Sequence, residues 1–255
     1  MSKQNKYEIQ KVKTDEETII DCGNLPSHPF FCTLVAGPGS GKTSVIMNIL
    51  LNPLLYGDSK KKTPYWNNII YISPSYLTDK TLAPLRKLQQ DEDNDKITIT
   101  AIYEDLENMD VILRTICDHL NEMKEEHKEE NIKTIIVIDD SSTLMNKKSD
   151  KTSYIARIVS TYRHIGYSLD CLFVSQRYLT IPQQLRVCSS CFLIYRINNK
   201  KDLKAICDEL GGVFGDDKFL ECYEEATQEK YSFMTVDMRK LTLRKKFNDL
   251  LFKKD

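Results

Sequence analysis

No apolar run in the sequence comes near the length of about 20 residues that a bilayer-spanning helix needs. The most apolar stretches, residues 30–36 and 135–138, have the length of buried strands. The N-terminal residues are polar and lack the apolar core of a secretory signal. We therefore expect no membrane span and no secretion signal, and a protein that works in a reducing interior.

Neither charge is in excess either. Lys and Arg number 36 against 37 Asp and Glu, so the formal net charge is −1. Overall charge therefore neither favours nor excludes nucleic acid as a partner, although a local basic face could still exist. The eight cysteines contain one close pair, Cys188 and Cys191, with no second pair or histidine pair to complete a zinc site. We interpret the cysteines as reduced residues that serve as small hydrophobic side chains.

Apolar and polar residues alternate along the chain in the patterns of strands and helices. Hydrophobic residues make up 41% of the 255, enough for one large α/β domain. Strands are predicted at residues 30–35, 68–73, 96–102, 134–138, 169–175, 191–197 and 231–236, and helices at residues 43–51, 104–124, 151–165, 202–210 and 217–226. This alternation predicts a mostly parallel central sheet with helices on both faces, where ligands bind at the carboxyl ends of the strands.

A Gly-rich turn separates the first of these strands from the first helix. The segment Ala36-Gly37-Pro38-Gly39-Ser40-Gly41-Lys42-Thr43 matches the P-loop pattern, except that Ala36 stands where the first glycine is usual. The glycines allow the backbone angles that turn successive N–H groups toward a phosphate, and the helix presents its positive N-terminal end. We predict that the turn and Ser44 bind ATP, with Lys42 at the β- and γ-phosphates and the Thr43 hydroxyl on Mg²⁺.

Two carboxylates and an amide follow later strands. Residues 135–138 are apolar and place Asp139 at the strand tip, where it is predicted to face Mg²⁺, with Asp140 polarising the attacking water. Two adjacent carboxylates repel each other, so this site needs a cation. Gln176 ends the next strand and is predicted to sense the γ-phosphate or orient the water. The alternatives are a helix cap near Lys151 for the Asp pair, and an ordinary turn amide for Gln176.

Together with the pair Arg163-His164, these motifs resemble the genome-packaging ATPases of large cytoplasmic DNA viruses and virophages, in the FtsK–HerA superfamily of P-loop NTPases. The resemblance covers residues 28–200 and implies a RecA-like (ASCE) core. It implies a homo-oligomeric ring, a hexamer or a pentamer, with double-stranded DNA in its channel and ATP between subunits. Capsid protein is a further candidate partner. The implied location is the host cytoplasm, in a virus factory, or the virion.

The resemblance also implies an arginine that each subunit supplies to its neighbour's nucleotide. The matching position is Arg163, and such a residue neutralises charge on the transferring phosphoryl group. On the predicted helix Arg163 flanks the buried stripe, whereas Arg157 points more squarely outward. Arg196 is another candidate, and a surface salt bridge is the alternative for each of the three.

Basic residues concentrate in Lys60-Lys61-Lys62 and in residues 238–255. Either segment could contact DNA phosphates. The lysines could equally be solvated, and the C-terminal segment, which also carries apolar residues, could instead be a docking helix. We expect an N-terminal polar arm over residues 1–27, an ATPase domain over residues 28–238 and a basic tail over residues 239–255.

The leading hypothesis is a motor that packages a viral genome by translocating double-stranded DNA at the expense of ATP. A HerA-like DNA helicase or recombination ATPase would share the same core. A small-molecule kinase would share the P-loop, but Asp139 and Asp140 with Gln176 favour water as the phosphoryl acceptor. A nucleotide-dependent switch would turn over very slowly. We expect no guanine-reading Asn-Lys-x-Asp pattern, and we therefore expect ATP rather than GTP as the nucleotide.

Overall fold

The computed structural model describes residues 19–126, 132–140 and 154–254. Its strands are β1 (Ile20–Cys22), β2 (Leu25–His28), β3 (Phe31–Val35), β4 (Asn68–Ile72), β5 (Thr98–Ile102), β6 (Thr134–Ile138), β7 (Leu169–Ser175), β8 (Cys191–Tyr195), β9 (Phe233–Asp237), β10 (Thr242–Lys245) and β11 (Asp249–Lys253). Within the described residues, β1 and β2 form a hairpin and the other nine strands form one sheet, in the order β11-β10-β9-β8-β3-β7-β6-β4-β5.

The centre of the sheet is parallel. Val35 of β3 pairs with Ser175 of β7, and Ile138 of β6 pairs with Phe173 of β7, so these three strands end at the same edge. Every residue of β3, β4, β6, β7 and β8 is buried, as expected for parallel strands covered on both faces. Beyond β8 the sheet is antiparallel, through β9, β10 and β11.

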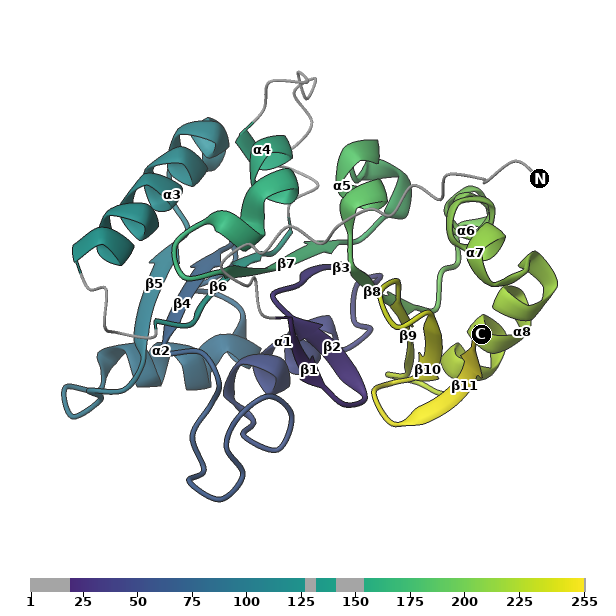
Figure 1. Cartoon of the computed structure of the whole chain (residues 1–255), viewed down its shortest axis with the longest axis horizontal. Coiled ribbons are helices and arrows are strands. Elements are labelled where there is room, and N and C mark those ends of the chain that lie inside the picture. Colours follow the sequence, from purple (N-terminus) through teal and green to yellow (C-terminus); the bar gives the residue numbers. More distant parts are fainter. Residues whose placement is uncertain (1–18, 127–131, 141–153, 255) are drawn as a thin grey trace, which may run out of the picture.

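Helices cover both faces of the sheet (Figure 1). One face carries α1 (Lys42–Leu51), the 3₁₀ turn η1 (Lys80–Leu82) and α2 (Ala83–Gln90). The other face carries η2 (Leu106–Asn108), α3 (Met109–Glu126), α4 (Tyr154–Thr161), η3 (Tyr162–His164), η4 (Tyr178–Thr180), α5 (Gln183–Cys188), α6 (Lys200–Ile206), the π-helical turn η5 (Cys207–Gly211), α7 (Gly212–Phe214) and α8 (Asp216–Thr227). None of the helices in the described ranges is long and apolar enough to cross a membrane.

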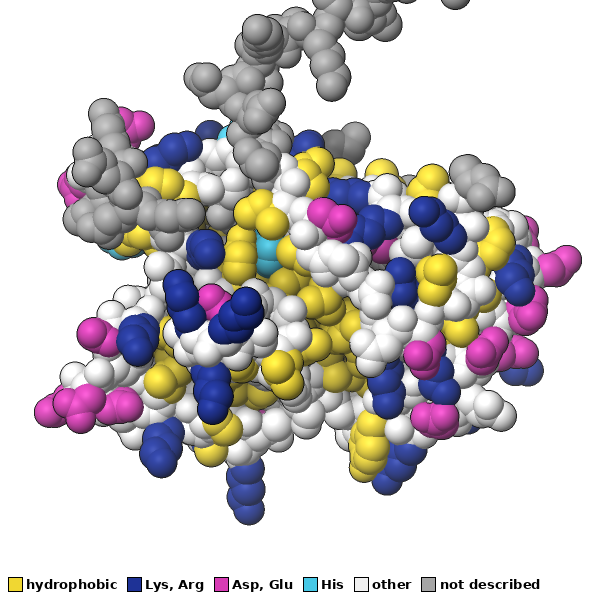
Figure 2. Space-filling model, turned by 60° about the horizontal axis from the view of Figure 1, so that its bottom comes forward, with side chains coloured by type: hydrophobic (Ala, Val, Ile, Leu, Met, Phe, Trp, Pro, Cys, Tyr) yellow, Lys and Arg dark blue, Asp and Glu magenta, His cyan; other side chains and the backbone are white. Residues whose placement is uncertain are grey.

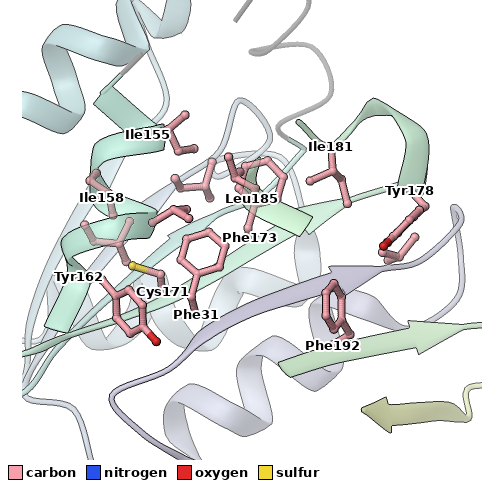
Figure 3. Packing of buried hydrophobic residues seen from close by; sticks show 14 of the residues in the cluster. Phe31, Ile155, Ile158, Tyr162, Cys171, Phe173, Tyr178, Ile181, Leu185 and Phe192 are labelled. Atoms are coloured by element: carbon pink, nitrogen blue, oxygen red, sulfur yellow. The ribbon is translucent and has the colours of Figure 1, made fainter. Parts of the chain in front are cut away.

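The strand residues divide between two hydrophobic cores, one on each face. Successive side chains of a strand point to opposite faces, so Phe31 and Val35 of β3 pack under α4 and α5, whereas Leu34 packs over α1. Figure 3 shows Phe31 and Phe173 meeting Ile155 and Leu185 in the first of these cores. The two cores pack on opposite faces of β3, β6 and β7 and thereby fix the positions of the loops that follow these strands.

The edge of the sheet opposite the ends of β3 and β7 contains a buried ion pair. His28 Nδ1 lies 2.7 Å from Asp170 Oδ2, and both side chains are almost fully buried. The Trp66 indole N–H donates to the same carboxylate at 2.8 Å, and the His28 ring stacks on Tyr65 with the ring centroids 4.0 Å apart. Burial lowers the pKa of His28, but the charge of Asp170 outweighs it and raises that pKa to about 9.

The predicted α/β class is confirmed, and each predicted strand is present within two residues at either end. The first predicted helix is also present, as α1. The helix predicted at residues 104–124 begins only at Met109, after η2, because Asp105 has a left-handed φ of 52°. The helix predicted at residues 151–165 ends at Thr161, and residues 151–153 lie outside the described residues. Helix α2 was missed because only one of its residues, Leu85, is buried.

The C-terminal segment is neither a separate tail nor a docking helix. Strand β10 pairs with β9, and β11 pairs with β10, so both extend the sheet. Several of the basic residues bind within the fold: Arg239 donates to the Tyr162 hydroxyl at 2.6 Å, and Lys240 lies 2.7 Å from Asp21. The predicted boundary between residues 27 and 28 also falls inside β2, all of which is buried. Residues 1–18 of the predicted arm lie outside the described residues.

Candidate nucleotide site

The P-loop turn joins β3 to α1 in a backbone conformation that requires glycine. Gly39 and Gly41 have φ angles of 69° and 89°, in the region that favours glycine. Ala36 is fully buried and takes no positive φ, which explains why alanine is accepted there. Its N–H donates to the Ser175 carbonyl at 3.0 Å and ties the start of the turn to the end of β7. Gly41 caps α1, so the first free N–H groups of the helix lie beside the turn.

Lys42 is the first residue of α1 and reaches across to the end of β6. Its ammonium donates to Asp139 Oδ1 at 2.7 Å and to Asp140 Oδ1 at 3.3 Å. Burial lowers the pKa of Lys42, but the two carboxylates outweigh it and raise that pKa. The structure therefore brings together the lysine and the acidic pair that the sequence placed about a hundred residues apart.

Asp139 is held from three sides. Only 1% of the residue is exposed. Besides Lys42, the Tyr71 hydroxyl donates to Asp139 Oδ2 at 3.1 Å, and the N–H of Asp140 donates to Oδ1 at 2.9 Å. Tyr71 lies on β4, next to β6, and both burial and the charge of Asp139 raise the pKa of its hydroxyl. Tyr71 was not among the predicted site residues. The one signal in the sequence is a tyrosine among the isoleucines of a strand that lies beside the strand preceding the Asp pair.

Gln176 and Asp140 meet at the same edge. Gln176 directly follows β7, and its amide donates to Asp140 Oδ1 at 2.8 Å. Asp140 has a left-handed φ of 56°, and its side chain is 27% exposed, so it lies more open to solvent than Asp139. Gln176 is thus part of the acidic site and not only a turn amide. The alternative of a helix cap near Lys151 falls outside the described residues.

The donor set at this edge fits Mg²⁺. Thr43 is buried in the first turn of α1, next to Lys42, and Ser44 after it is exposed. A hydroxyl and carboxylates are the oxygen ligands that Mg²⁺ prefers, together with oxygens of a bound phosphate. Among the described residues there is no group of three His, Cys, Asp or Glu side chains that could hold a metal ion.

The three candidate arginines lie in different places. Arg163 is exposed on η3, which precedes β7, so it lies at the edge of the sheet opposite the P-loop. Arg157 is exposed on α4, with its guanidinium 5.4 Å from the centre of the Tyr154 ring. Arg196 directly follows β8 and lines a cavity together with Gly39 and Ser40 of the P-loop. Of these three, Arg196 alone lies beside the P-loop of its own chain.

That cavity has a volume of about 310 Å³ and opens next to the P-loop, on the side away from Asp139. Besides the P-loop residues it is lined by Tyr195, Arg196 and residues 227–232. Residues 228–232 connect α8 to β9, nearly two hundred residues from the P-loop. No pattern in the sequence indicated that this connection returns to the nucleotide site.

Residues 199–202 spell the Asn-Lys-x-Asp pattern of guanine-reading loops, so the expectation that the sequence lacks this pattern is wrong. Here these residues have structural roles. Asn199 caps α6 by accepting from the N–H groups of Lys201 and Asp202. Asp202 is buried and accepts from the Arg177 guanidinium at 3.1 Å and from the Leu179 N–H at 3.0 Å. The pattern therefore does not argue for GTP over ATP.

The strand order β8-β3-β7-β6-β4, with a Gly-rich turn after β3, carboxylates after β6 and an amide after β7, defines a P-loop NTPase fold. The particular likeness is to a viral protein. The chain superimposes on the genome packaging NTPase B204 of Sulfolobus turreted icosahedral virus 2, in complex with ATP-gammaS, with a TM-score of 0.59 and 17% identity, over 85% of this chain and 96% of B204. The prediction of a fold like that of the packaging ATPases is confirmed.

Two further solved structures are similar. The DNA-packaging ATPase B204 from Sulfolobus turreted icosahedral virus gives a TM-score of 0.58 and 15% identity, over 85% of this chain and 96% of that chain. The pCW3 conjugation coupling protein TcpA, in its monomer form with ATPγS, gives a TM-score of 0.51 and 15% identity, over 80% of this chain and 56% of TcpA. At these identities the likeness establishes a shared fold. No family model matches the sequence, and no curated protein matches it.

Proposed function

We propose that this chain is an ATPase motor that translocates double-stranded DNA and packages a viral genome into a capsid. The observation that carries the proposal is the convergence of Lys42, Asp139, Asp140 and Gln176 at one edge of the sheet, directly beside the P-loop. A lysine, a carboxylate and a water-orienting amide are groups that P-loop enzymes use to hydrolyse a nucleoside triphosphate. The fold shared with the B204 packaging ATPases supports the choice of substrate and task.

Each residue of the site has a separate task in the proposed reaction. A bound triphosphate competes with the carboxylates for the Lys42 ammonium, which then neutralises charge on the β- and γ-phosphates. Asp140, held by the Gln176 amide, accepts a hydrogen bond from the attacking water and takes its proton. The water oxygen bonds to the γ-phosphorus, and the bond from that phosphorus to the bridging oxygen breaks. The electron pair stays on the oxygen, which leaves as part of ADP.

Thr43 and Asp139 would hold Mg²⁺, which when bound with the nucleotide offsets the negative charge of the phosphates. The buried position of Asp139 suits this task better than that of a base. Its oxygens already accept from Tyr71, Lys42 and the N–H of Asp140, so its orientation is fixed before any ligand arrives. Asp140, which is more exposed, is left for the water.

A trans arginine completes the proposed site. Arg163 is exposed at the edge of the sheet opposite the P-loop, a position that a neighbouring subunit in a ring can present to the next nucleotide. A hexamer or pentamer with ATP between subunits would make hydrolysis depend on assembly, because the neighbour's arginine adds to the charge that Lys42 supplies from the same subunit.

For the DNA contact we propose the loop that contains Lys60, Lys61 and Lys62. All three lysines are exposed. The C-terminal basic residues are poorer candidates, because Arg239, Lys240 and others bind within the fold. Figure 2 shows Lys and Arg side chains interleaved with Asp and Glu over the face drawn there, so that face offers no uniform basic track. The proposed place of work is the host cytoplasm or the virion, where DNA and capsid protein are both available.

The test is ATP hydrolysis with and without double-stranded DNA. The proposal predicts hydrolysis that DNA stimulates and that Lys42→Ala and Asp140→Asn both abolish. Lys87→Ala and Asp95→Asn, at exposed positions away from the site, are the matched controls and should hydrolyse ATP at the unaltered rate. Hydrolysis that is indifferent to DNA would keep the ATPase and contradict the motor. Transfer of the phosphoryl group to a nucleoside would replace the proposal with a kinase.

A further inference from the structure

The cavity beside the P-loop has a definite relation to the acidic site. Asp139, Asp140 and Gln176 follow β6 and β7, which lie on one side of β3. The cavity is bounded by the end of β8 and the start of β9, which lie on the other side of β3. A triphosphate held by the turn after β3, with its γ-phosphate at the carboxylates, therefore extends its α-phosphate end toward the cavity.

Tyr231 forms one wall of the cavity and touches the P-loop. A methyl group built on Gly41 would lie only 3.2 Å from Cδ1 of Tyr231, so the ring packs directly against the last glycine of the turn. Tyr231 has a left-handed φ of 62° and is 53% exposed, with the Lys230 ammonium 4.7 Å from its ring centre. Non-glycine residues held in the left-handed region cluster at active sites and ligand-binding sites.

Two buried hydroxyls of the same cavity lack partners. The Tyr195 hydroxyl and the Ser232 hydroxyl make no hydrogen bond to any described residue, although each residue is only 2% exposed. A third polar atom without a partner among the described residues, Ser40 Oγ, belongs to the P-loop wall. A buried polar group without a partner costs stability, and native proteins keep few of them, so three around one cavity indicate a polar ligand.

We propose that this cavity is the nucleoside subsite of the nucleoside triphosphate site, with Tyr231 as the surface on which the base stacks. The hydroxyls of Tyr195 and Ser232 then hydrogen-bond to the base or the ribose. The cavity volume of about 310 Å³ lies within the range of roughly 300–1,000 Å³ usual for small-molecule sites. This inference rests on the proposed function, because it assumes that the P-loop holds the triphosphate.

The test compares the binding of ATP with that of inorganic tripolyphosphate, by calorimetry on the full chain. Tyr231→Ala is expected to weaken ATP binding roughly ten- to a hundredfold, the usual contribution of one base stacked on an aromatic side chain, and to leave tripolyphosphate binding unchanged. Tyr231→Phe keeps the ring and should bind ATP like the unaltered chain. Equal losses for both ligands with Tyr231→Ala would show a distorted P-loop and overturn the inference.

Ser232→Ala is a second test, in which a loss of ATP affinity can be told apart from a loss of stability. The hydroxyl has no partner in the described structure, so its removal should leave the melting temperature unchanged or slightly raised. ATP binding should weaken by roughly two- to tenfold, the effect of one hydrogen bond. A loss of melting temperature without a loss of ATP affinity would contradict a role in binding.

The two levels of the proposal fail in different ways. If the unaltered chain binds tripolyphosphate as tightly as ATP, and Lys42→Ala abolishes both, the P-loop site stands and the nucleoside subsite is wrong. If the chain binds neither ligand, the proposed function and the subsite are both wrong. Both proposals are supported if ATP binds much more tightly than tripolyphosphate and Tyr231→Ala removes this difference without weakening tripolyphosphate binding.

Discussion

Tyr71→Phe removes one hydroxyl and leaves the ring, so it isolates the hydrogen bond that holds Asp139 from the side of β4. The hydroxyl lies 3.1 Å from Asp139 Oδ2, and both residues are almost fully buried. A hydrogen bond to a charged group contributes about 1.5–3 kcal/mol, and here the carboxylate oxygen left behind is buried. We therefore expect the free energy of unfolding to fall by about 2 kcal/mol in urea titrations.

Tyr76→Phe is the matched control. Tyr76 is equally buried, but its hydroxyl donates at 2.8 Å to the neutral amide oxygen of Gln89, and Gln89 is exposed to solvent. That substitution should cost only about 0.5–1.5 kcal/mol, because the acceptor is uncharged and water can replace the donor. If Tyr71→Phe proves no more costly than Tyr76→Phe, the account of Asp139 as a preoriented, buried carboxylate is wrong.

Three further predictions concern the catalytic groups and the ion pair at the opposite edge. Gln176→Ala should lower kcat by roughly a hundredfold and leave KM for ATP nearly unchanged, because the amide orients Asp140 rather than the nucleotide; a rise in KM alone would contradict this role. Arg163→Ala should lower kcat by roughly a thousandfold or more, and mixing it with Lys42→Ala subunits should restore part of the activity if the arginine acts in trans. The pKa of His28 is raised from 6.5 to about 9, so its contribution to stability is complete below about pH 6.5 and is lost as the pH rises through about 9. Urea titrations should show that the free energy of unfolding falls by about 3 kcal/mol between pH 6 and pH 10, and that this fall is absent in His28→Asn. The same pH dependence in His28→Asn would show that His28 is not its cause.

The parts of the site that sequence analysis found are those carried by local patterns. Two motifs can each be recognised from about ten consecutive residues: the Gly-rich turn between a strand and a helix, and the two Asp residues after an apolar strand. Gln176 was found in the same way, because parallel strands end at a common edge and a polar residue at that edge meets its neighbours. The register of β3, β6 and β7 then places all of these groups together.

The parts that were missed depend on contacts between distant segments. Tyr71 is 68 residues from Asp139 and reads as an ordinary strand residue until β4 is known to pair with β6. Tyr231 and Ser232 return to the P-loop only because β9 runs antiparallel to β8, a reversal that strand-helix alternation does not predict. The C-terminal strands were missed because the basic residues of this segment suggested a solvated tail. In the structure Arg239 donates to the Ser27 carbonyl and Lys240 pairs with Asp21.

The most direct test of the central claim is ATP-driven displacement of a third DNA strand from a triplex at the end of a long duplex. The account predicts that the unaltered chain releases the third strand only when ATP and Mg²⁺ are present, and that Asp140→Asn binds ATP without releasing it. Rapid ATP hydrolysis on the same duplex without any release of the third strand would contradict translocation.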